Sequence, residues 1–119
     1  MSHDLIFCLD EALARVDHDR ETFHMMIELF AEHGPKDLAD AETALKAGNT
    51  AGVALSSHKL KGAILQFCAP AASQACRDLE EAAKAGNLAH ARESYAALEK
   101  ELRRLLVALR HVLERGIAA

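Results

Sequence analysis

Residues 88–112, LAHARESYAALEKELRRLLVALRHV, show the clearest structural pattern of this 119-residue chain. Their apolar positions recur at alternating steps of three and four, which is the pattern of a helix that buries one stripe in a bundle. The stripe consists of Leu88, Ala91, Tyr95, Leu98, Leu102, Leu105, Leu109 and Val112. We therefore expect a long C-terminal helix that packs against several other helices.

The first half of the chain predicts two more helices. Asp19 is suited to cap the start of one of them, which should end at the Ala-Gly-Asn segment 47–49. Gly34-Pro35 could break or kink that helix, because proline lacks a backbone donor and clashes with the preceding turn. Before it, residues 4–16 predict a short helix whose inward positions are Leu5, Leu9, Leu13 and Val16.

Two helices are expected between these segments and the C-terminal helix. Asn49 or Thr50 should cap the first, which runs to about Phe67, and Pro70 suits the first turn of the second. A further Ala-Gly-Asn segment, 85–87, should end it. No segment alternates with a period of two, and short connections favour antiparallel neighbours. The sequence thus predicts one all-α domain over residues 1–119, an up-and-down antiparallel four-helix bundle with a short additional N-terminal helix.

Composition excludes several classes of protein. The formal net charge of -4 and the pI near 5.9 argue against nucleic acid as the main partner. No apolar run approaches the length of a membrane span, and no secretory signal is present. The three cysteines, Cys8, Cys68 and Cys76, are an odd number without paired spacing, so reduced thiols are the simplest interpretation. We expect a cytoplasmic protein that does not associate with membranes.

The segment His58-Lys59-Leu60-Lys61-Gly62 is the main functional candidate. On a helical projection His58 lies opposite the apolar stripe, beside Lys61 and Gly62, so its ring should point outward. Most histidines in small helical proteins are surface or packing residues. Gly62 argues against that interpretation, because a glycine inside a helix costs about 1 kcal/mol and usually marks a close approach. The stripe opposite His58 consists of Val53, Leu60, Ile64 and Phe67.

Three segments resemble one known family, the histidine-containing phosphotransfer (HPt) domains of phosphorelays. Residues 58–62 resemble its His-x-Leu-Lys-Gly core, residues 76–80 its Cys-x-x-Leu-Glu segment, and residues 44–49 its Ala-Leu-x-x-Gly-Asp turn. The resemblance covers most of the chain. It implies that His58 accepts the phosphoryl group and that Lys61 and Gly62 occupy the supporting positions. Lys59 stands at a variable position that is often basic.

Three positions depart from the family pattern. Cys68 stands ten residues after the histidine, where glycine is common, and Leu65 replaces a residue that is often small. Ser57 precedes the histidine, where alanine is frequent. We expect Cys68 to alter the turn after the histidine helix and Leu65 to shield the histidine or to tune docking to one partner.

The chemistry expected of this helix is phosphoryl transfer. A neutral imidazole keeps one free lone pair and can attack an aspartyl phosphate in line. Such a transfer needs mainly positioning and charge neutralisation. We expect Lys61, on the solvent side, to place a cation near the phosphoryl oxygens, and Gly62 to leave room for the incoming domain.

The same helix offers candidates for partner binding. Lys59 is expected to steer an acidic partner. Leu55 and Leu65 lie on the outward face and predict an apolar docking patch, unless another helix covers one of them. The partners implied are response-regulator receiver domains and a hybrid sensor kinase, with this chain a monomer. No ATP-binding motif is visible, so the chain should need no cofactor of its own, and the receiver should bring the aspartate and its Mg²⁺.

Other functions remain open at this point. A carboxylate-bridged metal site would need two Glu-x-x-His motifs, but only Glu21-x-x-His24 is present, so no metal is expected. Cysteine catalysis is disfavoured because Cys76 lies on a core stripe. The serious alternative is a bundle of the same fold that acts only as a protein-interaction module and is never phosphorylated.

Overall fold

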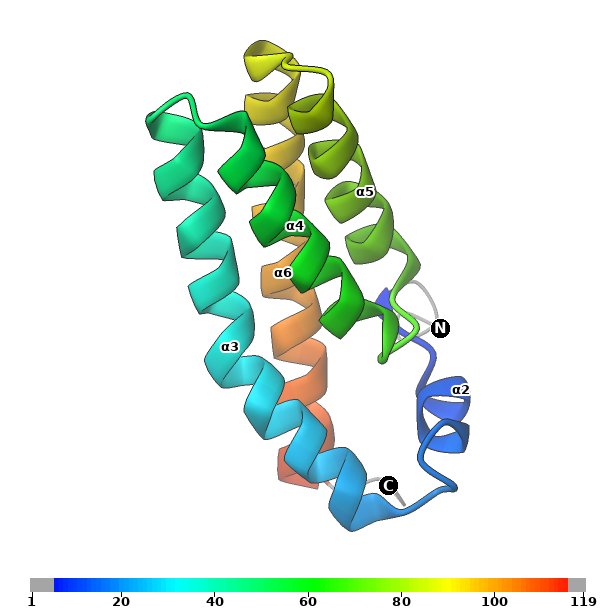
Figure 1. Ribbon diagram of the computed structural model, residues 1–119. Coiled ribbons are helices and arrows are strands. Elements are labelled where there is room, and N and C mark those ends of the chain that lie inside the picture. Colours follow the sequence, from blue (N-terminus) through cyan, green and yellow to red (C-terminus); the bar gives the residue numbers. More distant parts are fainter. Residues whose placement is uncertain (1–5, 116–119) are drawn as a thin grey trace.

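The computed structural model describes residues 6–115 and is an all-α bundle (Figure 1). Four helices form the bundle, each beside the next along the chain, and the first also packs against the last. The bundle helices are α3 (Arg20–Lys46), α4 (Thr50–Leu65), α5 (Pro70–Lys84) and α6 (Leu88–Arg115), and the short α2 (Leu9–Ala14) precedes them. This arrangement confirms the predicted up-and-down four-helix bundle.

Local signals set the starts of the bundle helices. The Asp19 carboxylate accepts hydrogen bonds from the backbone N–H groups of Glu21 and Thr22 at the start of α3. The Asn49 side chain accepts one from Gly52 N–H at the start of α4, so Asn49 rather than Thr50 is the cap. Pro70 is the first residue of α5, where its missing N–H costs no hydrogen bond.

Helix α3 continues through Pro35 without a break. Buried residues lie on one stripe on both sides of the proline: Phe30 and Gly34 before it, Ala41 and Leu45 after it. Pro35 itself is exposed. Packing of that stripe against α4 and α6 therefore holds the helix together where the local signal favoured an interruption.

The N-terminal segment differs from the expected helix over residues 4–16. Within the described residues α2 spans only Leu9–Ala14, and residues 4 and 5 lie outside them. Phe7 is not helical and is completely buried in the core, and the Cys8 N–H donates to the Cys68 carbonyl oxygen at 3.0 Å. Leu13 is buried as predicted. The predicted continuous helix is thus interrupted at Phe7 and Cys8, where burial in the core and a tertiary hydrogen bond, rather than helical periodicity, set the backbone.

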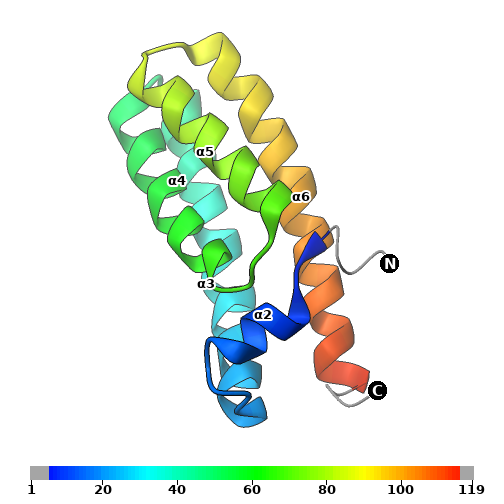
Figure 2. The ribbon, with the colours of Figure 1, turned by 90° about the vertical axis from the view of Figure 1, so that its right-hand side faces the viewer.

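The core closes below α4, where α3 and α6 extend beyond the shorter helices (Figure 2). The α4 helix ends at Leu65, and Phe67 then turns inward in the connection to α5. Its ring lies 6.0 Å from that of Phe23 and 5.1 Å from that of Phe30, measured between centroids. These aromatic contacts anchor the end of α4 and fix which of its faces points outward. Among residues 6–115 no helix is long and apolar enough to cross a membrane.

Candidate functional site

Helix α4 has a buried face and an exposed face, as the sequence predicted. Val53, Leu60 and Ile64 are completely buried. Ser57 is buried too, and its hydroxyl donates to the Val53 carbonyl oxygen at 2.7 Å, so serine replaces alanine there without an unsatisfied polar group. The side chain of His58 is 66% exposed. His58 is therefore presented to solvent by a helix whose other face is locked in the core.

The exposed face of α4 carries a strip formed by Leu55, His58, Gly62 and Leu65, which we call the docking strip. Leu55 is 61% and Leu65 is 41% exposed, so no helix of the described chain covers either leucine. A Cβ atom at Gly62 would meet no atom within 4 Å. Lys59 is exposed next to the strip. The space beside His58 is open, as expected if Gly62 leaves access to the ring.

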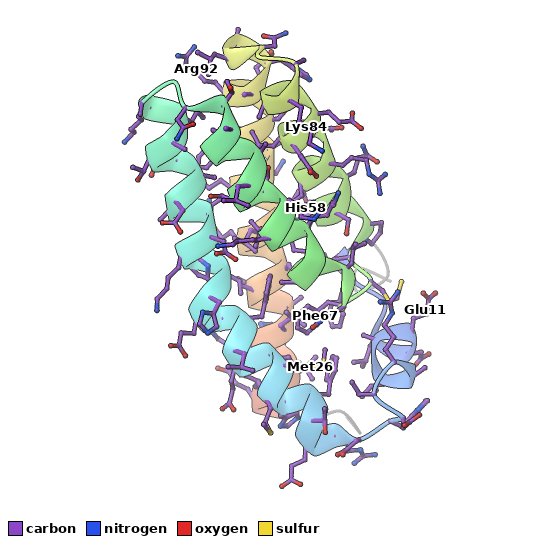
Figure 3. All side chains as sticks on the ribbon, in the orientation of Figure 1. Glu11, Met26, His58, Phe67, Lys84 and Arg92 are labelled. Carbon is purple, nitrogen blue, oxygen red and sulfur yellow. The ribbon has the colours of Figure 1, made fainter. Side chains whose placement is uncertain are left out.

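Glu80 of α5 connects His58 to two lysines. Its carboxylate is nearly buried, with 6% of the side chain exposed, yet it faces α4. One oxygen, Oε2, lies 3.1 Å from Nδ1 of His58 and 3.1 Å from Nζ of Lys84. The other, Oε1, accepts a hydrogen bond of 2.8 Å from Nζ of Lys61. Figure 3 shows Lys84 on α5 near His58, on the side of the bundle where α4 and α5 face the viewer.

The charge state of Glu80 follows from these contacts. The hydrogen bond from Lys61, with smaller contributions from those of Lys84 and His58, lowers the pKa of Glu80 from its ordinary 4.5 to about 2. Burial opposes this effect, because it disfavours the charged carboxylate. The carboxylate is therefore charged at neutral pH, and it can accept a hydrogen bond from a protonated Nδ1 of His58.

The sequence predicted that Lys61 lies free on the solvent side, and the structure shows that it does not. Only 22% of its side chain is exposed, and its ammonium group is held by the buried carboxylate of Glu80. Lys84 is the more accessible cation, with 66% of its side chain exposed. The expectation failed because a helical projection places Lys61 only on its own helix and cannot include the carboxylate that α5 presents to it.

Sequence reasoning missed Glu80 and Lys84 as members of the site. Their spacing of four residues on one helix is a signal for an ion pair. Glu80 also ends the Cys-x-x-Leu-Glu segment. The link to His58, however, joins residues 22 positions apart. Only the packing of α4 against α5 brings these groups together.

The structure explains the departure at Cys68 and the inertness expected of Cys76. Cys68 has a φ of +53°, a left-handed conformation that glycine adopts at much lower cost, which accounts for the glycine common at this turn. Cys76 is completely buried, and burial raises the pKa of its thiol to about 12, so it is an inert core residue as predicted. Within residues 6–115 no three His, Cys, Asp or Glu side chains gather in a group that could hold a metal ion.

Comparison with known proteins adds to this geometry. The family model of the Hpt domain matches residues 25–110, which include His58 and Glu80 and the two lysines paired with Glu80, Lys61 and Lys84. The chain belongs to the Hpt domain family. This confirms the resemblance found in the sequence and places this Hpt domain in histidine phosphotransfer of two-component phosphorelays.

A solved structure shares the fold of this Hpt domain. It is the crystal structure of histidine-containing phosphotransfer protein B (HptB) from Pseudomonas aeruginosa PAO1. The two are similar with a TM-score of 0.85 and 22% sequence identity, over 92% of this chain and 96% of that one. A search of curated proteins found no match.

Proposed function

We propose that this Hpt domain accepts a phosphoryl group on His58 from the aspartate of one receiver domain and passes it to another receiver. The observation that carries the proposal is an exposed imidazole whose Nδ1 lies 3.1 Å from a buried, charged carboxylate, Glu80. A histidine that only covered the surface would not need such a partner from another helix.

Glu80 supports a specific nucleophile. When Nδ1 carries the ring proton and its N–H donates a hydrogen bond to Glu80, the free lone pair is on Nε2. In the transfer, a P–N bond forms at Nε2 while the P–O bond of the aspartyl phosphate breaks. The ring then acquires positive charge, which the Glu80 carboxylate beside Nδ1 stabilises. We therefore assign the phosphoryl group to Nε2.

The lysines support this chemistry through their charge. Glu80 contributes one negative charge, whereas Lys61 and Lys84 contribute two positive charges, so the cluster keeps a positive surplus. That surplus favours a phosphoryl group on His58. Lys61 acts mainly by holding Glu80, and Lys84, which is more exposed, is placed to approach the phosphoryl oxygens.

The docking strip supports a receiver domain as the partner. Leu55 and Leu65 flank His58 and Gly62 with exposed apolar surface, and Lys59 adds a positive charge beside the strip. The receiver supplies the aspartate and its Mg²⁺, and a hybrid sensor kinase supplies the first receiver. We place the domain, as a monomer, in the cytoplasm with these partners.

The test is transfer from a phosphorylated receiver domain to the chain. Label should appear on the chain, be lost in acid, and vanish in His58→Gln, while the helical circular dichroism of the variant stays unchanged. His90→Gln is the matched control, because His90 is also exposed and lies 3.8 Å from a carboxylate oxygen of Glu93. The control should be labelled like the parent chain.

Two results would contradict the proposal. Label that persists on His58→Gln would show that another residue accepts the group. A chain that binds receivers through the docking strip but is never labelled would be the interaction module considered above. For labelled protein, nitrogen NMR of the ring distinguishes phosphorylation at Nε2 from phosphorylation at Nδ1, and the second outcome would refute the role assigned to Glu80.

A further inference from the structure

Two cysteines that are distant in sequence meet beside the turn between α4 and α5. The backbone N–H of Cys8 donates to the carbonyl oxygen of Cys68 at 3.0 Å. Each residue is partly buried, so neither is sealed in the core. Both also line one pocket of about 400 Å³, together with residues of α2 and of the first turns of α5. Figure 3 shows this region around Glu11, another residue of the pocket lining.

The backbone hydrogen bond sets the distance between the two residues. The nitrogen is bonded to one Cα and the carbonyl carbon to the other, so an N···O distance of 3.0 Å keeps the two Cα atoms within roughly 6 Å of each other. Disulfides require about 4.4–6.8 Å between Cα atoms. Cys8 is extended, with a φ of -103° and a ψ of 98°, and both residues border the same open space. A covalent link therefore needs side-chain rotation and little movement of the backbone.

We propose that Cys8 and Cys68 form a reversible disulfide that links the N-terminal segment to the turn between α4 and α5. The oxidant is a peroxide. One thiol reduces hydrogen peroxide to water and becomes a sulfenic acid, and the second thiol then displaces a second water molecule as the S–S bond forms. The proposal rests on this geometry and does not depend on the proposed phosphotransfer.

Cys76 is the natural internal control. It is completely buried on α5, with no exposed surface at which an oxidant could act. The disulfide would close a loop of about 60 residues, which restricts the unfolded chain strongly. In the reduced chain, the burial of Phe7 and the Cys8–Cys68 hydrogen bond help to hold the segment before α2 at residues 7 and 8.

The experiment treats the reduced 119-residue chain with hydrogen peroxide and maps disulfides by mass spectrometry. We expect the loss of two hydrogen atoms from the monomer and a tryptic link between peptides 1–15 and 62–77, with fragmentation placing the bond at Cys68 rather than Cys76. The Cys76→Ser variant should form the same link, whereas Cys8→Ser and Cys68→Ser should not. The melting temperature of the oxidised parent should rise by about 10 °C and return on reduction.

Several outcomes would overturn the proposal. One is oxidation that stops at sulfenic or sulfinic acid on either cysteine of the parent chain. Another is a disulfide that joins two chains, seen as a dimer on a non-reducing gel. A third is a bond that maps to Cys76. Because the parent chain alone yields the peptide map, the result does not depend on whether the serine variants fold.

Discussion

Replacing Glu80 with glutamine tests whether the buried carboxylate supports both the fold and the site. The pKa of Glu80 falls from 4.5 to about 2 in the folded chain. At 1.36 kcal/mol per pKa unit, this difference corresponds to about 3 kcal/mol of folding free energy at neutral pH. Glutamine keeps the size and can still accept a hydrogen bond from Lys61, so Glu80→Gln should lower the free energy of unfolding by about 1–3 kcal/mol.

The pH dependence identifies the origin of that loss. A carboxylate with a lowered pKa stabilises the fold above its unfolded pKa, and this stabilisation disappears as the pH falls through the folded pKa. The difference in the free energy of unfolding between the parent chain and Glu80→Gln should therefore be largest above about pH 4.5 and decrease steadily towards pH 2. Urea unfolding followed by circular dichroism across this range measures it.

Glu81→Gln is the matched control. Glu81 is the next residue of α5 and is exposed, and no ion pair of the described structure includes it. The free energy of unfolding of the Glu81→Gln variant should differ from that of the parent chain by less than about 0.5 kcal/mol at every pH. Two results would refute this explanation: a decrease in the free energy of unfolding of Glu80→Gln no larger than that of the control, or a decrease that stays constant between pH 7 and pH 2. Transfer to His58 in the same samples should slow for Glu80→Gln alone.

Substitutions at three further positions test neighbouring parts of the structure. Lys61→Ala should lower the free energy of unfolding by about 1–3 kcal/mol, because it removes the closest partner of the buried Glu80 carboxylate. If Lys61 were a free surface cation, urea unfolding would show a much smaller decrease. Gly62→Ala should raise the free energy of unfolding by up to about 1 kcal/mol, since its Cβ enters open space. Gly62→Gln should fold as well as the parent chain but accept the phosphoryl group poorly, because its side chain crowds the space beside His58. Thermal melts and phosphoryl-transfer rates on the same samples decide this. Cys68→Gly should raise the free energy of unfolding under reducing conditions by up to about 1 kcal/mol, because it relieves a left-handed conformation. A lower melting temperature of this variant would show that the thiol contacts matter more.

The course of the helices could be predicted where the signals are local. Asp19, Asn49 and Pro70 act on backbone groups within one turn of themselves, so the neighbouring sequence is enough to predict their effect. Pro35 and Phe7 are different. Their local signals favoured a possible interruption of α3 and a longer N-terminal helix, and contacts with distant residues overrode both.

The candidate site divides in the same way. The sequence by itself determined that His58, Gly62, Leu55 and Leu65 face outward, because helical periodicity places them opposite a stripe that must be buried. Only the tertiary structure decided that Glu80 meets His58 and that Lys61 is held rather than free. The register and rotation of α5 against α4 set those distances, and they depend on packing throughout the core rather than on any short stretch of sequence.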